Sequence, residues 1–143
     1  MYRVIKTYGH ERGYSCSFRQ WNAKSNCKYL HGYSLGFKIT LESPTLDKNN
    51  WVYNFGDFSF LEKWLDKNFD HTLLVASDDP EKKSILKLNN MAAKVNELEK
   101  ISCEFFAELT YKFVAEHLMS ENINVVSVEV SEHGSNAASY YEE

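Results

Sequence analysis

A cysteine and a histidine stand four residues apart in the segment Cys27-Lys28-Tyr29-Leu30-His31. The neighbouring residues are polar, which is typical of a loop, and an alternating apolar run follows almost at once. A thiol beside a lysine and an imidazole is expected to ionise more readily than a free cysteine. We therefore predict that Cys27 is a nucleophile or general base, although a lone cysteine is more often a buried packing residue. Cys16 and Cys103 have apolar neighbours and are predicted to be structural.

Asp70 and His71 form an adjacent carboxylate–imidazole pair at the end of a predicted helix. A carboxylate bonded to one imidazole nitrogen fixes the tautomer and leaves the other nitrogen free to move protons. The pair is therefore predicted to act as an acid/base relay. The alternative is a histidine that complements the negative end of the helix dipole, next to an exposed aspartate.

Glu132 ends the last predicted strand and precedes His133 and Gly134. Inside a pocket, a carboxylate can accept two parallel N–H bonds from the guanidine-like edge of a heterocycle. Outside a pocket, the same residue is an ordinary solvated strand end. Glu132 is therefore a candidate ligand-binding residue if this strand end borders a cavity.

Alternating and helical hydrophobic patterns predict the elements that position these residues. Leu35, Phe37, Ile39 and Leu41 alternate with small or polar residues, the pattern of a half-buried strand. Val126, Val128 and Val130 alternate in the same way, and Ser102 is a predicted helix N-cap. The predicted strands are 2–8, 14–18, 35–41, 51–55 and 126–130, and the predicted helices are 58–65, 81–88 and 102–118, with 89–100 left open.

The strands surround a helical segment instead of alternating with helices one for one. That order favours an α+β fold, an antiparallel sheet with helices on one face. The first and last strands would then be sheet edges that need a partner.

The bulk composition is that of one globular domain over residues 1–143. A formal net charge of −4 and the lack of a dense Lys/Arg run argue against a nucleic-acid partner. No apolar stretch approaches the roughly 18–20 residues that span a bilayer, and the first residues lack the apolar segment of a signal peptide. Three cysteines without a CxxC motif suit a reducing compartment, so we expect a cytoplasmic protein.

Taken together, these motifs resemble the 6-pyruvoyl-tetrahydropterin synthase family, which includes the 6-carboxytetrahydropterin synthase of the queuosine pathway. The family's hallmarks are a cysteine loop leading into His-Gly-His, then Asp-His-x-x-Leu-Asn, then a C-terminal glutamate before a tyrosine. The corresponding segments here are Cys27 to Gly32, Asp70 to Leu74, and Glu132 with Ala138 and Tyr140 behind it. Val52 to Asp57 is similar to the segment after the family's second strand, with Asn54 where aspartate is usual, and Ser102-Cys103-Glu104 resembles its Thr-x-Glu helix start.

The resemblance implies a T-fold: an antiparallel four-stranded sheet with two main helices on one face, oligomerising into a barrel. It further implies a homohexamer with active sites between subunits, and a lyase acting on the side chain of 7,8-dihydroneopterin triphosphate without a redox cofactor. Cys27 would remove a side-chain proton and Asp70–His71 would relay it. Glu132 would hold the pterin ring, and Ser102 would join it in binding the substrate.

The resemblance also implies a zinc ion held by three histidines, and here the chain departs from the family. Phe18, His31 and Tyr33 occupy the three ligand positions. Phenylalanine cannot bind a metal, and a catalytic zinc site needs three protein donors. Cys16, on the same face of its strand, is a weak substitute because it lies roughly 6–7 Å along the strand from the lost ligand. We therefore expect zinc to be absent or weakly bound.

Three functions remain open at this point. The first is a working pterin side-chain lyase, favoured by the presence of Cys27, Asp70, His71 and Glu132 together. The second is a pterin- or purine-binding homologue that has lost zinc and the elimination step, favoured by Phe18 and Tyr33. The third is a structural or partner-binding oligomer, which no specific residue supports.

Overall fold

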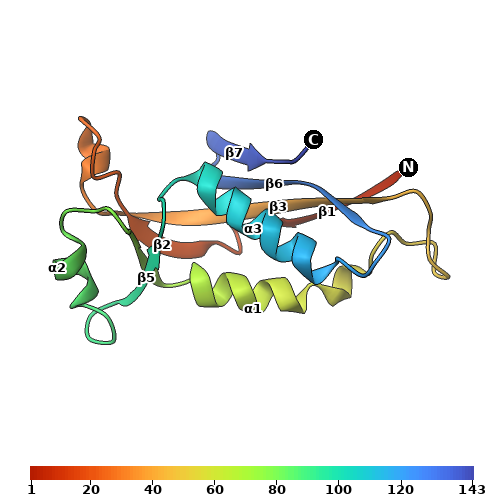
Figure 1. Cartoon of the computed structure of the whole chain (residues 1–143), viewed down its shortest axis with the longest axis horizontal. Coiled ribbons are helices and arrows are strands. Elements are labelled where there is room, and N and C mark those ends of the chain that lie inside the picture. The colour runs from red at the N-terminus through yellow and green to blue at the C-terminus, as the bar shows by residue number, and fades with distance from the viewer.

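The computed structural model describes residues 1–143, and one long strand runs through its centre (Figure 1). Strand β3 (His31–Ser43) pairs along one edge first with β2 (Tyr14–Phe18) and then with β1 (Tyr2–Tyr8). Along its other edge β3 pairs with β6 (Asn124–His133), which pairs in turn with β7 (Asn136–Tyr140). All four pairings are antiparallel, so the predicted antiparallel sheet is present, and the strands predicted at 2–8 and 14–18 are β1 and β2.

Two short strands extend the sheet beyond β2 by parallel pairing. Strand β4 (Thr72–Ala76) pairs with β2, and β5 (Lys94–Leu98) pairs with β4. The full sheet is therefore mixed and has seven strands, in the order β5-β4-β2-β3-β6-β7 with β1 beside β3. All five residues of β4 are buried, so this strand lacks the alternation that reveals a half-buried strand in a sequence.

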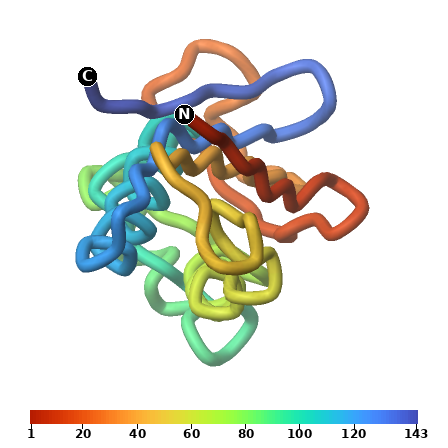
Figure 2. The backbone as a smooth tube through the Cα atoms, turned by 90° about the vertical axis from the view of Figure 1, so that its right-hand side faces the viewer, coloured from red at the N-terminus to blue at the C-terminus, as the bar shows by residue number.

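Helices α1 (Ser59–Asn68) and α3 (Cys103–His117) cover one face of the sheet, and both chain ends lie on the side of the molecule away from α1 (Figures 1 and 2). Tyr111 of α3 packs edge-on against Tyr140 of β7, with ring centroids 5.1 Å apart. The short helix α2 (Lys82–Leu86) lies beside β4. Ser102 is the N-cap of α3, as predicted: its hydroxyl oxygen accepts a hydrogen bond from the Phe105 N–H at 3.0 Å. No helix combines the length and apolar character needed to cross a membrane.

The core lies between the helices and the inward face of β3. The four alternating side chains of that strand are at most 1% exposed, and Phe106 of α3 packs edge-on against Phe18 at a centroid distance of 5.4 Å. Burying a large apolar side chain is worth about 1.5–3 kcal/mol relative to leaving it in water. The core therefore fixes the end of β2, where Phe18 lies, against the start of α3. The four side chains of β3 are Leu35, Phe37, Ile39 and Leu41.

The prediction of a strand at 51–55 is wrong. This segment forms turns that end in a 3₁₀ helix, η2 (Phe55–Asp57). The Asp47 carboxylate accepts a hydrogen bond from the Trp51 N–H at 3.1 Å, and the Asn54 amide oxygen accepts one from the Gly56 N–H at 2.9 Å. These bonds satisfy backbone donors that a strand would have paired with a neighbour.

The alternation of β6 is interrupted by one extra residue. Thr40 pairs with Ser127 but Leu41 pairs with Val125, so Val126 is left between two register positions. Val125 is consequently buried and Val126 is only partly so, whereas the prediction placed Val126 inward. Val128 and Val130 are buried as predicted.

Candidate functional site

The turn that carries Cys27 is a short 3₁₀ helix, η1 (Asn26–Lys28), and the thiol is exposed. The Ser25 hydroxyl oxygen accepts a hydrogen bond from the Cys27 N–H at 3.3 Å. The segment after β2 holds the turn from the other side. The Gln20 N–H donates to the Cys27 carbonyl oxygen at 2.8 Å, and Arg19 Nη1 donates to the Lys28 carbonyl oxygen at 3.1 Å. The predicted polar loop is thus an anchored turn that presents a thiol to solvent.

Cys27, Tyr33 and Glu132 together line two adjoining hollows at this end of the sheet. The three residues come from η1, β3 and β6, which are brought together by the pairing of β3 with β6. The larger hollow, of about 750 Å³, also includes His10, His31 and His133. The smaller hollow, of about 250 Å³, also includes Phe18, Gln20, Ser102 and Glu104.

Glu132 is held in place by the start of β7. Its Oε1 atom accepts a hydrogen bond from the Asn136 side-chain amide at 3.1 Å and lies 3.6 Å from His133 Nε2. About a quarter of the Glu132 side chain is exposed. Oε2 has no partner within the chain, so it is free to accept a hydrogen bond from a molecule in either hollow.

The N-terminus of α3 contributes a second carboxylate, which was not among the predicted site residues. Glu104 lines the smaller hollow together with Glu132 and Ser102. Burial raises the pKa of the Cys103 thiol to about 12, and the negative charges of Glu132 and then Glu104 add to the shift. The signal that could have identified Glu104 is its place in Ser102-Cys103-Glu104, which resembles the family's Thr-x-Glu helix start. It was not predicted as a site residue, because an acidic residue in the first turn of a helix is ordinarily explained by the helix dipole.

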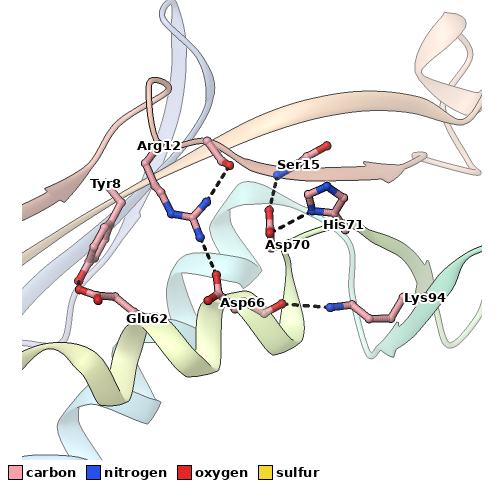
Figure 3. Close-up of polar contacts among 9 residues, drawn as sticks. Tyr8, Arg12, Ser15, Glu62, Asp66, Asp70, His71 and Lys94 are labelled. Atoms are coloured by element: carbon pink, nitrogen blue, oxygen red, sulfur yellow. Dashed lines mark hydrogen bonds and ion pairs between the residues drawn. The ribbon is translucent and has the colours of Figure 1, made fainter.

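Asp70 and His71 form the predicted pair just beyond the end of α1. Asp70 Oδ2 lies 3.0 Å from His71 Nδ1, and Asp70 Oδ1 accepts a hydrogen bond from the Ser15 N–H at 3.1 Å (Figure 3). The His71 backbone N–H donates to the Ser15 carbonyl oxygen at 2.5 Å, and His71 has a left-handed φ of 57°. Because a carboxylate only accepts, His71 Nδ1 donates and Nε2 remains available. The His71 side chain is 83% exposed.

His71 faces a different hollow from the one that Cys27 and Glu132 line. This third hollow, of about 410 Å³, includes Cys16, Leu30 and Lys94, and His31 lines both this hollow and the 750 Å³ one. Within one chain, therefore, the structure brings together Cys27, Glu132 and Ser102 but leaves Asp70–His71 apart from them.

Comparison with known proteins shows which family has this sequence pattern. The profile of the family described as 6-pyruvoyl tetrahydropterin synthase matches residues 8–143. The chain belongs to this family. Within it, a 6-carboxy-5,6,7,8-tetrahydropterin synthase of Aquifex aeolicus is 27% identical over 96% of this chain and 86% of its own length. The enzyme of the same name from Rickettsia typhi is 41% identical, but the match covers 41% of this chain and only 43% of that relative.

Solved structures confirm the predicted T-fold. A crystal structure of an uncharacterized protein from Wolinella succinogenes superposes with a TM-score of 0.85, at 18% identity, over 99% of this chain and 98% of that one. A 6-pyruvoyltetrahydropterin synthase of Plasmodium vivax superposes with a TM-score of 0.71, at 13% identity, over 99% and 97%. At such low identities the likeness concerns the fold alone.

The family generally binds zinc, and the three positions implied by the resemblance do lie together in this chain. Phe18 pairs directly with His31 across β2 and β3, and Tyr33 is two residues further along β3. Side chains at these positions point to the same face of a sheet. Phe18 is buried and stacks on Tyr33, with centroids 4.3 Å apart and an interplanar angle of 10°.

The side chains at these positions do not fit a zinc ion. Only His31 carries a good donor, and nowhere in the chain are three or more His, Cys, Asp or Glu side chains grouped as a metal would require. Cys16 does not fill the position of Phe18, because it lies two residues, roughly 6–7 Å, away along β2. The three positions that the resemblance implies for the metal thus hold a single good donor side chain, His31.

Proposed function

We propose that this protein binds a reduced pterin at the Cys27–Glu132 hollows and acts on the pterin side chain as a 6-pyruvoyl- or 6-carboxytetrahydropterin synthase-like lyase. The proposed substrate is 7,8-dihydroneopterin triphosphate. The observation that carries the proposal is that an exposed thiol and a carboxylate with one free oxygen line the same hollows. Membership of a lyase family and the pterin synthase names of the relatives support it.

In this proposal Glu132 binds the pterin ring and Cys27 acts on the pterin side chain. The Glu132 carboxylate accepts hydrogen bonds from the exocyclic amine and ring N–H of the pterin, and the Ser102 hydroxyl donates a further one. The pterin side chain then extends toward Cys27. The Cys27 thiolate removes a proton from a side-chain carbon, forming S–H as the C–H bond breaks.

Asp70 and His71 would complete the site from a neighbouring subunit, as the resemblance implies. Within one chain the pair lines a separate hollow, and the exposed imidazole leaves Nε2 free for proton transfer. Strand β1 pairs only with β3 and β7 pairs only with β6, so each has an unpaired edge at which subunits could join into the homohexameric barrel.

A subunit-mixing experiment tests this shared site. Mixing inactive Cys27→Ala subunits with inactive His71→Ala subunits should restore turnover, because some sites then receive both intact residues. If each site lies within one chain, the mixture should show no turnover.

A second candidate function is supported by the Phe18–Tyr33 stack. Since these side chains do not fit zinc, no step is assigned to a metal, and the Lewis-acid contribution of several kcal/mol that a metal supplies is lacking. Phe18 and Tyr33 give the site an aromatic wall instead. The alternative is therefore a pterin- or purine-binding homologue that has lost zinc and the elimination activity.

Incubation with 7,8-dihydroneopterin triphosphate distinguishes these functions. The lyase releases triphosphate, with acetaldehyde in the carboxytetrahydropterin branch, and Cys27→Ala abolishes release. Cys16→Ala, the same chemical change at a buried position, should retain most of it. Binding without release supports the second function. Absence of both binding and release rejects the proposed site.

A further inference from the structure

The three family metal positions form a connected array in this chain. Tyr33 is clamped on one side by the stack on Phe18, which itself packs edge-on against Phe106. On the other side its hydroxyl group is hydrogen-bonded to His31 Nε2. The phenol ring therefore has a fixed position, and Tyr33 lines both hollows together with Cys27 and Glu132.

The hydrogen-bond direction in this array follows from the next partner along. His31 Nδ1 lies 2.8 Å from the Tyr29 carbonyl oxygen, which can only accept. Nδ1 therefore carries a hydrogen, and in the tautomer protonated at Nδ1 alone, Nε2 is an acceptor. The Tyr33 O–H must then donate to Nε2. The phenol hydrogen is used in the bond to His31. A ligand can therefore interact only with the lone pairs of the phenol oxygen, by donating a hydrogen bond to it.

The phenol stays neutral in this position. A tyrosine phenol ordinarily has a pKa of about 10, well above neutral pH. At neutral pH the Tyr33 oxygen is thus an uncharged hydrogen-bond acceptor near the ligand-binding carboxylate. A metal ion at this place would bind a ligand atom through its lone pairs. The Tyr33 oxygen instead binds a ligand group that donates a hydrogen bond.

We infer that the Tyr33 hydroxyl oxygen, oriented by His31, is a specificity determinant that accepts a hydrogen bond from a hydroxyl group on the side chain of the bound pterin. The inference rests on the proposed function, because Glu132 must hold the ring for the side chain to reach Tyr33. It adds that the protein prefers pterins with a hydroxylated side chain over pterins that have none. One neutral hydrogen bond corresponds to about a five- to tenfold difference in affinity.

The test compares two ligands with and without the donor. Neopterin, with a trihydroxypropyl side chain, and unsubstituted pterin are titrated separately by fluorescence into the wild-type protein and into Tyr33→Phe. Phenylalanine retains the aromatic ring and its stack on Phe18, so the variant should remain folded, which a thermal melt checks. Tyr53→Phe is the matched control, because its hydroxyl donates to the Asp57 carbonyl oxygen away from these hollows.

The expected result is a five- to tenfold weaker affinity of Tyr33→Phe for neopterin, with the affinity for pterin changed less than twofold and Tyr53→Phe unchanged for both. His31→Phe, which removes the acceptor that orients the phenol, should also weaken neopterin selectively. Equal changes for both ligands, or no change for either, overturn the inference while leaving pterin binding in place. If the wild-type protein binds neither ligand, or if Glu132→Gln binds both as tightly as wild type, the proposed function fails as well.

Discussion

Arg19 and Asp79 form an ion pair through two contacts, with Nε 2.9 Å from Oδ2 and Nη2 2.5 Å from Oδ1. The Asp79 side chain is 2% exposed and that of Arg19 is 20% exposed. The same guanidinium donates through Nη1 to the Lys28 carbonyl oxygen, next to Cys27. Through Arg19, the turn that carries the candidate catalytic thiol is thus tied to a buried carboxylate that lies sixty residues from Arg19 in the sequence.

Removing the carboxylate should therefore be costly. Breaking a buried pair leaves the remaining charge uncompensated, and we expect Asp79→Asn to lower the free energy of unfolding by about 3 kcal/mol. Urea denaturation measures this loss. The control is Asp66→Asn, which removes the exposed partner of Arg12 and should cost less than about 1 kcal/mol. Equal losses at the two positions would show that the buried pair has no special role in stability.

The same pair predicts the direction of a pH effect. The hydrogen bond from Arg19 holds the pKa of Asp79 below its usual value, against the opposing effect of burial. A carboxyl group with a lowered folded pKa contributes stability that is present above its unfolded pKa, about 4, and is lost as the pH falls through the folded pKa. The stability difference between wild type and Asp79→Asn should thus be constant from pH 7 to 5 and shrink below about pH 4. A difference that grows on acidification would contradict this linkage.

Two substitutions should convert the aromatic array into a metal site. Phe18, His31 and Tyr33 share one face of the β2–β3 pair, so Phe18→His with Tyr33→His places three imidazoles at the positions that the resemblance implies for zinc. Metal analysis after dialysis should find about one zinc per chain in the double variant and far less in wild type. One zinc per chain in the wild-type protein would refute our interpretation of these positions.

Of the three cysteines, only Cys27 is expected to react quickly in the native protein. Its thiol is exposed, whereas burial raises the pKa of both the Cys16 and Cys103 thiols to about 12. Brief treatment with iodoacetamide at pH 7.5 should label Cys27, and peptide mass mapping identifies the site. Urea-unfolded protein, in which all three cysteines should react, is the control. Preferential labelling of Cys103 would indicate that the smaller hollow is open to the reagent and that Cys27 is shielded.

The α+β class and the main elements could be predicted because their signals are local. The period-two run in β3 and the Ser102 cap of α3 are properties of consecutive residues. Strand β4 gave no such signal, because both of its faces are buried and it is only five residues long. The segment at 51–55 has strand-like residue types, but hydrogen bonds from Asp47 and Asn54 side chains to the backbone decide its structure.

Sequence motifs could predict which residues belong to the candidate site, but not how all of them are arranged in space. Cys27 and Glu132 were proposed from residue type and spacing and Ser102 from the family resemblance, and the fold places all three around the same hollow. The position of His71 on a separate hollow depends on how β4 pairs with β2, a contact between distant segments that no local pattern specifies. The hydrogen bond between Tyr33 and His31 likewise arises from side-chain orientation within the folded sheet.

The most direct test of the central claim is the rate of Cys27 alkylation with and without pterin. If Glu132 holds the ring in hollows that Cys27 lines, saturating pterin should slow alkylation of Cys27 at least fivefold in the wild-type protein and leave the rate unchanged in Glu132→Ala. No protection of the wild-type thiol, or equal protection in Glu132→Ala, would contradict the account.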